Sequence, residues 1–247
     1  MTPLAALIIT YNEEDNIKEC LESIKWIEEI VIVDSYSSDS TLEICRNYTD
    51  EIYQKEFIDI SSQRNYGLEQ IEADWVLVID ADERVTADLK KEIKQVLANN
   101  TEVEGYFIPR KNYFLGKWIK YCGWYPDYTL RLFQTKYRFK GKVHEKVNID
   151  NSTSRLKNDF IHYTYKNLEQ YINKINNFTT ISAAEMYQKG RKVNPFYVGL
   201  RTFFEFFKKY ILQKGILLGP QGLLLSILSS YYKFLKYAKL WEKHNNS

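Results

Sequence analysis

The chain has 247 residues, of which 45% are hydrophobic, so it can form one large domain with a sizeable core or one domain with an appendage. Its 34 lysine and arginine residues nearly balance its 32 aspartate and glutamate residues, which argues against a dedicated nucleic-acid-binding protein. The three cysteines have neither metal-ligand spacing nor a disulfide pattern, as is typical of a reducing compartment, and we expect no signal peptide.

Strand and helix patterns alternate along the first hundred residues. Apolar runs predict strands at residues 4–10, 30–33 and 75–79. Helical periodicity predicts helices at residues 12–26, 40–48, 61–71 and 86–98. This order predicts a parallel sheet with helices on both faces. Further on, we expect an aromatic, loop-like stretch with short antiparallel strands at residues 106–137 and a long helix at residues 166–187.

Two carboxylates, Asp80 and Asp82, follow the apolar strand at residues 75–79. In open α/β sheets, ligands bind at the carboxyl ends of the strands. Two carboxylates one residue apart repel each other, and a divalent cation is the usual reason for such a pair. Mg²⁺ prefers one or two carboxylates together with phosphate oxygens of a substrate. The pair therefore predicts a metal-bridged phosphate substrate, with a solvated acidic turn as the alternative.

Polar clusters also follow the first two predicted strands, at residues 10–14 and 34–39. Asn12, Asp39 or Ser40 could serve instead as caps of the following helices. The sequence has neither a G-x-G-x-x-G nor a Walker A loop. A nucleotide bound at this sheet edge would therefore need a metal to hold its phosphates.

Several motifs carry a resemblance to a known family. The strand-end motifs are Ile9-Thr10-Tyr11-Asn12-Glu13, Ile32-Val33-Asp34-Ser35 and Asp80-Ala81-Asp82-Glu83. The others are Gln63-Arg64-Asn65, Trp124-Tyr125-Pro126-Asp127, Arg131-Leu132-Phe133, Val143-His144-Glu145 and His162-Tyr163. In this order the set resembles the family 2 inverting glycosyltransferases of the GT-A fold, and in particular the bacterial lipopolysaccharide-core glucosyltransferases. The resemblance covers about residues 4–165 and implies a Rossmann-like α/β fold, with a mostly parallel sheet flanked by helices.

The resemblance implies a site for a UDP-sugar. Its expected residues are Thr10, Tyr11, Glu13, Asp34, Arg64, Asp80 and Ala81. Asp34 would accept a hydrogen bond from a uracil N–H group, and Arg64 would lie near the nucleotide or its phosphates. Asp80 would reach the ribose or the water shell of the metal.

The resemblance also implies a Mg²⁺ or Mn²⁺ cofactor that Asp82 binds directly. The metal-binding histidine of the family matches His162 best, because His162 follows an apolar, strand-like stretch. His144 is the competing match, and either histidine could be structural instead.

An inverting transfer needs a carboxylate that deprotonates the acceptor hydroxyl while the diphosphate leaves from the opposite face of the sugar. Asp127 is our candidate, since it lies in an aromatic stretch suited to sugar stacking and matches the catalytic position of the family. A turn after Pro126 is its structural alternative, and Glu145 is the second candidate base. We expect Trp124 and Arg131 to contact the acceptor, although Arg131 could instead pair with a nearby acid.

The carboxyl-terminal part of the chain is basic and amphipathic. From Gly190 onward there are 10 basic and 2 acidic residues, a net charge of +8, whereas the preceding part carries 24 basic and 30 acidic residues, a net charge of −6. We therefore expect a glycosyltransferase domain at residues 1–189 and a helical extension at residues 190–247. Basic amphipathic helices bind anionic membrane surfaces, although they also pack on their own domain or on a second subunit.

Together these patterns predict an inverting, metal-dependent hexosyltransferase that moves a hexose, by preference glucose, from a UDP-sugar to a lipid-linked or lipopolysaccharide-core saccharide. We expect it in the cytoplasm, on the inner face of a bacterial membrane, without a nucleic-acid partner. One alternative is a non-catalytic, membrane-associated sugar-nucleotide-binding or scaffold protein. A phosphohydrolase with an aspartate nucleophile is disfavoured, because Arg84 stands where those enzymes have threonine or valine.

Overall fold

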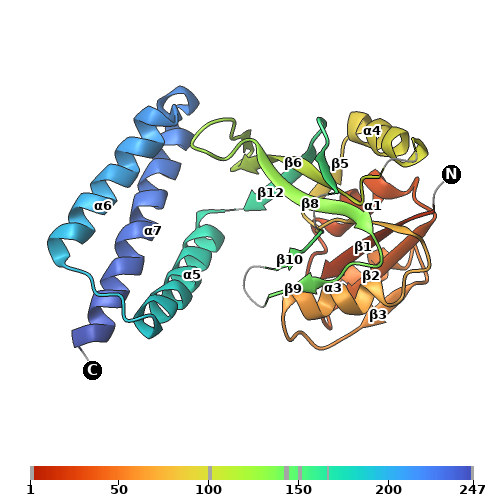
Figure 1. The fold of residues 1–247 in the computed structure, drawn as a ribbon, viewed down its shortest axis with the longest axis horizontal. Helices are drawn as coiled ribbons and strands as arrows, with labels where there is room; N and C mark the ends of the chain where they lie inside the picture. The colour runs from red at the N-terminus through yellow and green to blue at the C-terminus, as the bar shows by residue number, and fades with distance from the viewer. Residues whose placement is uncertain (1–2, 100–101, 142–144, 150–151, 166, 246–247) are drawn as a thin grey trace. The chain divides into compact units, whose positions relative to one another are not determined.

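The computed structural model describes residues 3–99, 102–141, 145–149, 152–165 and 167–245. The chain forms two compact units (Figure 1). The first comprises residues 1–111 and 127–162, and the second comprises residues 112–126 and 163–247. This division is made on contacts and differs from the boundary expected near residue 190 from the charge pattern. The functional boundary near residue 190 stays a prediction.

The first unit contains a mixed sheet with the strand order β3-β2-β1-β4-β8-β6-β12-β5. The parallel part consists of β1 (Leu4–Thr10), β2 (Glu29–Asp34), β3 (Ile52–Gln54) and β4 (Trp75–Val78). The antiparallel part comprises β8 (Asp127–Gln134) beside β4, β6 (Gly105–Phe114) beside β8, and β12 (Phe160–Tyr165) beside β5 (Glu83–Val85). Short strands complete the fold: β7 (Lys117–Trp118), β9 (Phe139–Lys140), β10 (Lys146–Val147) and β11 (Thr153–Arg155).

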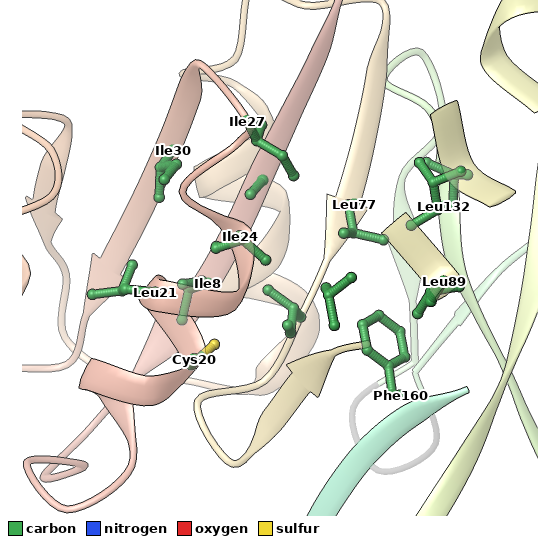
Figure 2. Close-up of a cluster of buried hydrophobic side chains, with 14 of the residues drawn as sticks. Ile8, Cys20, Leu21, Ile24, Ile27, Ile30, Leu77, Leu89, Leu132 and Phe160 are labelled. Atoms are coloured by element: carbon green, nitrogen blue, oxygen red, sulfur yellow. The ribbon is translucent and has the colours of Figure 1, made fainter. Parts of the chain in front are cut away.

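Helices cover both faces of the parallel strands, as predicted (Figure 1). One face packs against α1 (Ile17–Ile24), α2 (Thr41–Cys45) and α4 (Ala87–Ala98), with the side chains shown in Figure 2 at its core. The other face packs against α3 (Ile60–Leu68). Alternate residues of β1 point to opposite faces, so Ile8 lies in the first core and Leu7 in the second.

Two local expectations need correction. The first helix begins at Ile17 rather than at residue 12, because Asn12 has a left-handed backbone (φ 54°) and its side chain accepts a hydrogen bond from the Ser38 N–H group. Residues 106–137 are not mainly loop, since they contain all but the first residue of the 10-residue strand β6 and the whole of the 8-residue strand β8. Arg110 and Arg131, which form ion pairs with the buried Glu83, interrupt the apolar pattern typical of such strands.

The second unit is mostly helical. It contains α5 (Leu168–Gln188), α6 (Pro195–Phe207), the short helices η1 (Lys208–Leu212) and η2 (Gly215–Leu218), and α7 (Pro220–Asn245). α7 packs against both α5 and α6 (Figure 1). A Cβ atom at Gly222 would lie 1.9 Å from the Gly215 carbonyl oxygen, so this close approach of η2 and α7 requires glycine. Within the described residues, no helix is both long and apolar enough to cross a membrane.

Candidate functional site

The loops after β1 and β2 form one hydrogen-bonded cluster around Asp34. In the parallel register Thr10 lies opposite Asp34, so both loops leave the sheet at the same edge. Asp34 is fully buried and accepts hydrogen bonds from the Ser37 N–H group (2.8 Å) and from the Ser37 hydroxyl (2.5 Å). The Gln54 amide also donates to Asp34 (3.3 Å). The Asp34 carboxylate is thus held rigidly, and its expected bond to a nucleobase stays a prediction.

The residues expected around the nucleotide differ in exposure. Tyr11 is 60% exposed, whereas Thr10 and Ala81 are buried. The backbone N–H group of Glu13 donates to the Thr41 hydroxyl (2.8 Å), which ties the first loop to α2. Thr10 and Tyr11 are adjacent, so this edge combines a buried hydroxyl with an exposed ring.

Seven alternating charges form a chain of ion pairs, all within the first unit. In order of contact they are Glu145, Arg64, Asp80, Arg131, Glu83, Arg110 and Asp127. We call this set the charge chain. It brings together five of the predicted site residues. Arg64 comes from α3, Asp80 follows β4, Asp127 and Arg131 lie in β8, and Glu145 precedes β10.

The centre of the charge chain is buried. Arg64 donates to Asp80 (2.6 Å) and to Glu145 (3.1 Å). Arg131 donates to Asp80 and to Glu83 (3.2 Å), and Arg110 donates to Glu83 (3.3 Å). Because Glu83 is fully buried, its two guanidinium partners compensate a charge that water does not reach.

The two arginines beside Asp80 control its charge. Burial alone would raise the pKa of Asp80, but Arg131 and Arg64 outweigh burial and hold this pKa well below its ordinary value. Among the described residues, the buried Nε atoms of Arg64 and Arg131 have no hydrogen-bond partner. Each guanidinium group therefore has one buried N–H group without a protein acceptor in the part of the chain that the structure describes.

The two candidate bases lie at opposite ends of the charge chain. Asp127 opens β8, and its Oδ2 atom accepts from Arg110 Nη2 (2.6 Å) and Nε (3.0 Å). Glu145 pairs with Arg64 through one carboxylate oxygen (3.1 Å). Each of these two carboxylates is therefore paired with one arginine of the charge chain, whereas Asp80 and Glu83 lie between two arginines.

The Asp82 carboxylate lies beside His162 (Oδ2 to Nε2, 3.3 Å). The antiparallel register of β5 and β12 places His162 opposite Glu83, the residue after Asp82. Both side chains remain partly exposed. A carboxylate oxygen beside an imidazole nitrogen could hold a divalent cation that takes its other ligands from phosphate and water, and the carboxylate is the ligand of the pair that suits Mg²⁺ and Mn²⁺.

The described parts of the chain contain no group of three or more carboxylate, imidazole or thiol side chains that could enclose a metal. A cation at Asp82 and His162 would therefore depend on substrate oxygens. His144, the competing histidine, lies outside the described residues.

The expected acceptor residues lie in different surroundings. Trp124 belongs to the second unit, where its ring packs edge-on against Phe114 (5.9 Å) and its carbonyl accepts from Asn112 (3.1 Å). Arg131 pairs with two acids, which was the alternative open to it. Because Arg131 is buried and pairs with Asp80 and Glu83, it is a member of the charge chain.

Two members of the charge chain, Glu83 and Arg110, were not expected. Glu83 belongs to one of the motifs but has no role assigned from the sequence, and Arg110 lies in the aromatic stretch that contains most of β6. A charged residue inside a strand pattern was the available signal, since a buried charge needs a partner.

Comparison with known proteins assigns the family. The family model described as "Glycosyl transferase family 2" matches residues 5–180. The chain belongs to glycosyl transferase family 2. It is 29% identical over 260 residues to the lipopolysaccharide core biosynthesis glycosyltransferase LpsC of Rhizobium meliloti, a match that covers 98% of this chain and 93% of that protein. An uncharacterized glycosyltransferase of Rickettsia typhi is 26% identical, with 98% and 88% covered.

Solved structures support the fold. The crystal structure of S. aureus TarS 1-349 in complex with UDP is similar with a TM-score of 0.51 and 17% identity, covering 98% of this chain and 91% of that chain. The complex of the same protein with UDP-GlcNAc gives a TM-score of 0.50 and 14% identity. This family 2 glycosyltransferase therefore has the GT-A fold that its motifs predicted.

Proposed function

We propose that this family 2 glycosyltransferase is an inverting, metal-dependent enzyme that transfers a hexose, by preference glucose, from a UDP-sugar to a lipid-linked or lipopolysaccharide-core saccharide. The observation that carries the proposal is the separation of the carboxylates. The negative charge of Asp80 is compensated by two arginines, Asp82 lies beside His162, and Asp127 lies at one end of the charge chain. Three carboxylates in three surroundings can take three roles.

The comparisons support the donor and the acceptor class. TarS has been crystallised with UDP and with UDP-GlcNAc, and this chain shares its fold. LpsC is named for lipopolysaccharide core biosynthesis, and the chain matches it along nearly its whole length. We infer a UDP-sugar donor and an acceptor saccharide carried by a lipid.

In the proposed mechanism, the uracil binds at the loop that contains Asp34, and the diphosphate lies near the guanidinium groups of Arg64 and Arg131, whose positive charge attracts it. Asp127 takes the proton of the acceptor hydroxyl as its oxygen forms the new bond to the anomeric carbon. The bond from that carbon to the diphosphate breaks on the opposite face, and UDP leaves with the bonding electrons. This single displacement inverts the anomeric configuration.

Asp82 and His162 would hold the Mg²⁺ or Mn²⁺ ion. When bound, such an ion stabilises the negative charge that develops on the leaving diphosphate. The arginines of the charge chain would act on the same charge from the protein side.

We further propose a peripheral location on the inner face of a bacterial membrane. The net charge of +8 from residue 190 onward supports it, because anionic lipids attract basic segments near a membrane surface. A lipid-linked acceptor would be presented at the same surface.

A thermal-shift panel tests the donor proposal. UDP-, GDP-, dTDP- and CMP-sugars are each added with and without Mn²⁺, and a ligand that binds the native state raises the unfolding midpoint. We expect a metal-dependent rise with UDP-glucose. A rise with a different nucleotide would correct the donor, and a rise that is equal without metal would contradict the role of Asp82 and His162.

A further inference from the structure

The helices α6, η1 and η2 of the second unit form a helical segment that we call the hairpin, and one side of it carries large, solvent-exposed apolar side chains. We call this surface the α6–η2 face. Nine of its residues have exposed fractions between 41% and 79%: Phe196, Leu200, Phe203, Phe204, Phe207, Ile211, Leu212, Ile216 and Leu217. Monomeric soluble proteins rarely expose apolar patches of this extent, and those that do use them for protein or membrane contacts.

The opposite side of the hairpin is already occupied by its own unit. The Cys122 N–H group donates to the Gln213 carbonyl (2.9 Å), and Lys209 Nζ donates to the Cys122 carbonyl (2.7 Å). Leu218 is buried in the core of the second unit together with residues of α7. These contacts fix the hairpin, so its apolar side cannot turn inward without losing them.

The segment is also strongly basic. Between residues 191 and 217 there are six lysine or arginine residues and a single acid, Glu205. Arg191, Lys192, Arg201 and Lys214 are exposed. An apolar helix face with exposed cations is the pattern of helices that lie in the interface of an anionic bilayer.

A hollow of about 580 Å³ lies at the amino-terminal end of α6. Arg191 and Lys192 contribute two cations to its lining, and Leu200, Tyr197 and Tyr237 contribute apolar and aromatic surface. Its volume is in the range of small-molecule sites. Cations next to apolar walls match the chemistry of a phospholipid, which has a phosphate next to acyl chains.

We propose that the α6–η2 face inserts into the headgroup–hydrocarbon boundary of an anionic bilayer and that the hollow receives an anionic lipid headgroup. The inference deepens the peripheral location in the proposed function and rests on it, but adds that apolar insertion holds the protein in place. A second copy of the chain is a poorer occupant, because a twofold interface would bring the same basic patch against itself.

Vesicle sedimentation of the full chain tests the proposal. The wild type is mixed with vesicles of 30% phosphatidylglycerol and 70% phosphatidylcholine, in low salt and in 1 M NaCl. Phe203→Ser/Leu217→Ser removes two exposed apolar side chains of the face, and Phe57→Ser/Ile58→Ser is the matched control in the first unit, where both side chains are also exposed. Thermal unfolding and UDP calorimetry check that each variant folds and retains its donor site.

We expect the wild type to keep most of its binding in 1 M NaCl, because salt screens charges but not apolar burial. Phe203→Ser/Leu217→Ser should lower the partition coefficient roughly a hundredfold, about tenfold for each side chain, and the control should bind like the wild type.

Other outcomes would overturn the inference. Release by salt, with equal binding of the face variant and the wild type, would leave an electrostatic association and no insertion. A dimer in light scattering that Phe203→Ser/Leu217→Ser dissociates would identify a second copy as the occupant. If the wild type binds no vesicle, the peripheral location fails as well, while UDP calorimetry on the same sample still reports on the donor site.

Discussion

Glu83→Gln tests whether the charge chain depends on its buried centre. The Glu83 carboxylate is fully buried and accepts three hydrogen bonds: from Arg110 (3.3 Å), from Arg131 (3.2 Å) and from the Asp80 N–H group (3.1 Å). Both arginines donate to Oε1 and the N–H group donates to Oε2. A glutamine can present one oxygen only, so at least one donor loses its acceptor and both guanidinium groups lose a compensating charge.

The expected cost follows from these contacts. Removing one partner of a buried ion pair costs about 3–5 kcal/mol, because the remaining charge stays buried. Arg131 keeps Asp80 and Arg110 keeps Asp127 in the variant, so we expect the lower end, about 3 kcal/mol. At a urea slope of about 2 kcal/mol/M, the unfolding midpoint would fall by about 1.5 M.

Urea unfolding monitored by far-UV circular dichroism is the assay, and the slope must match that of the wild type. Lys91→Gln is the matched control, since Lys91 and Asp88 form an exposed ion pair (3.6 Å) on α4 and its removal should leave the midpoint unchanged. A loss below about 1 kcal/mol for Glu83→Gln would refute the argument that the buried Glu83 carboxylate and its two arginine partners compensate each other.

Further predictions concern the carboxylates. Asp82→Ala should abolish the Mn²⁺-dependent part of UDP binding in calorimetry and leave the metal-independent part unchanged. Asp127→Asn should keep UDP affinity but lower turnover about 10²- to 10⁴-fold, whereas Glu145→Gln should not lower turnover to this extent. If Glu145→Gln lowers turnover in this way and Asp127→Asn does not, Glu145 is the base. Hydrogen bonds, first that from Lys136, lower the pKa of Glu104 from 4.5 to about 2, so its stabilising effect is present above pH 4.5 and is lost as the pH falls toward 2. Glu104→Gln should therefore lower the thermal midpoint at pH 6 but not at pH 2.

The parallel half of the fold could be predicted because its strands are buried on both faces. β1 and β4 consist of short apolar runs bounded by polar loops, and β1 has the predicted bounds. α4 begins one residue after the predicted start, because Thr86 is its cap and accepts from the Leu89 N–H group (3.2 Å). Local pattern and local hydrogen bonding agree in these elements.

The antiparallel half could not be predicted in the same way. β6 and β8 carry Arg110 and Arg131, which are stabilised by acids 17 to 51 residues away in the sequence. A local sequence window does not contain such partners, so the pattern of residues 106–137 predicts an aromatic loop rather than two long strands. The amphipathic pattern of the carboxyl-terminal segment was visible, but the sequence could not say which helices pack in the second unit and which side stays exposed.

The two aspartates of Asp80-Ala81-Asp82 show how far the motif itself could lead. The sequence places both at the end of one strand, where either could bind a metal. The structure separates them, because Arg64 comes from α3 and Arg131 from β8, and both reach Asp80. Asp82 instead lies beside His162, which the pairing of β5 with β12 brings next to it. A cation at Asp80 would compete with two guanidinium groups for one carboxylate. A cation at Asp82 would compete with a single imidazole. These contacts support the proposal that Asp82 is the metal ligand and that Asp80 orients the arginines toward the diphosphate.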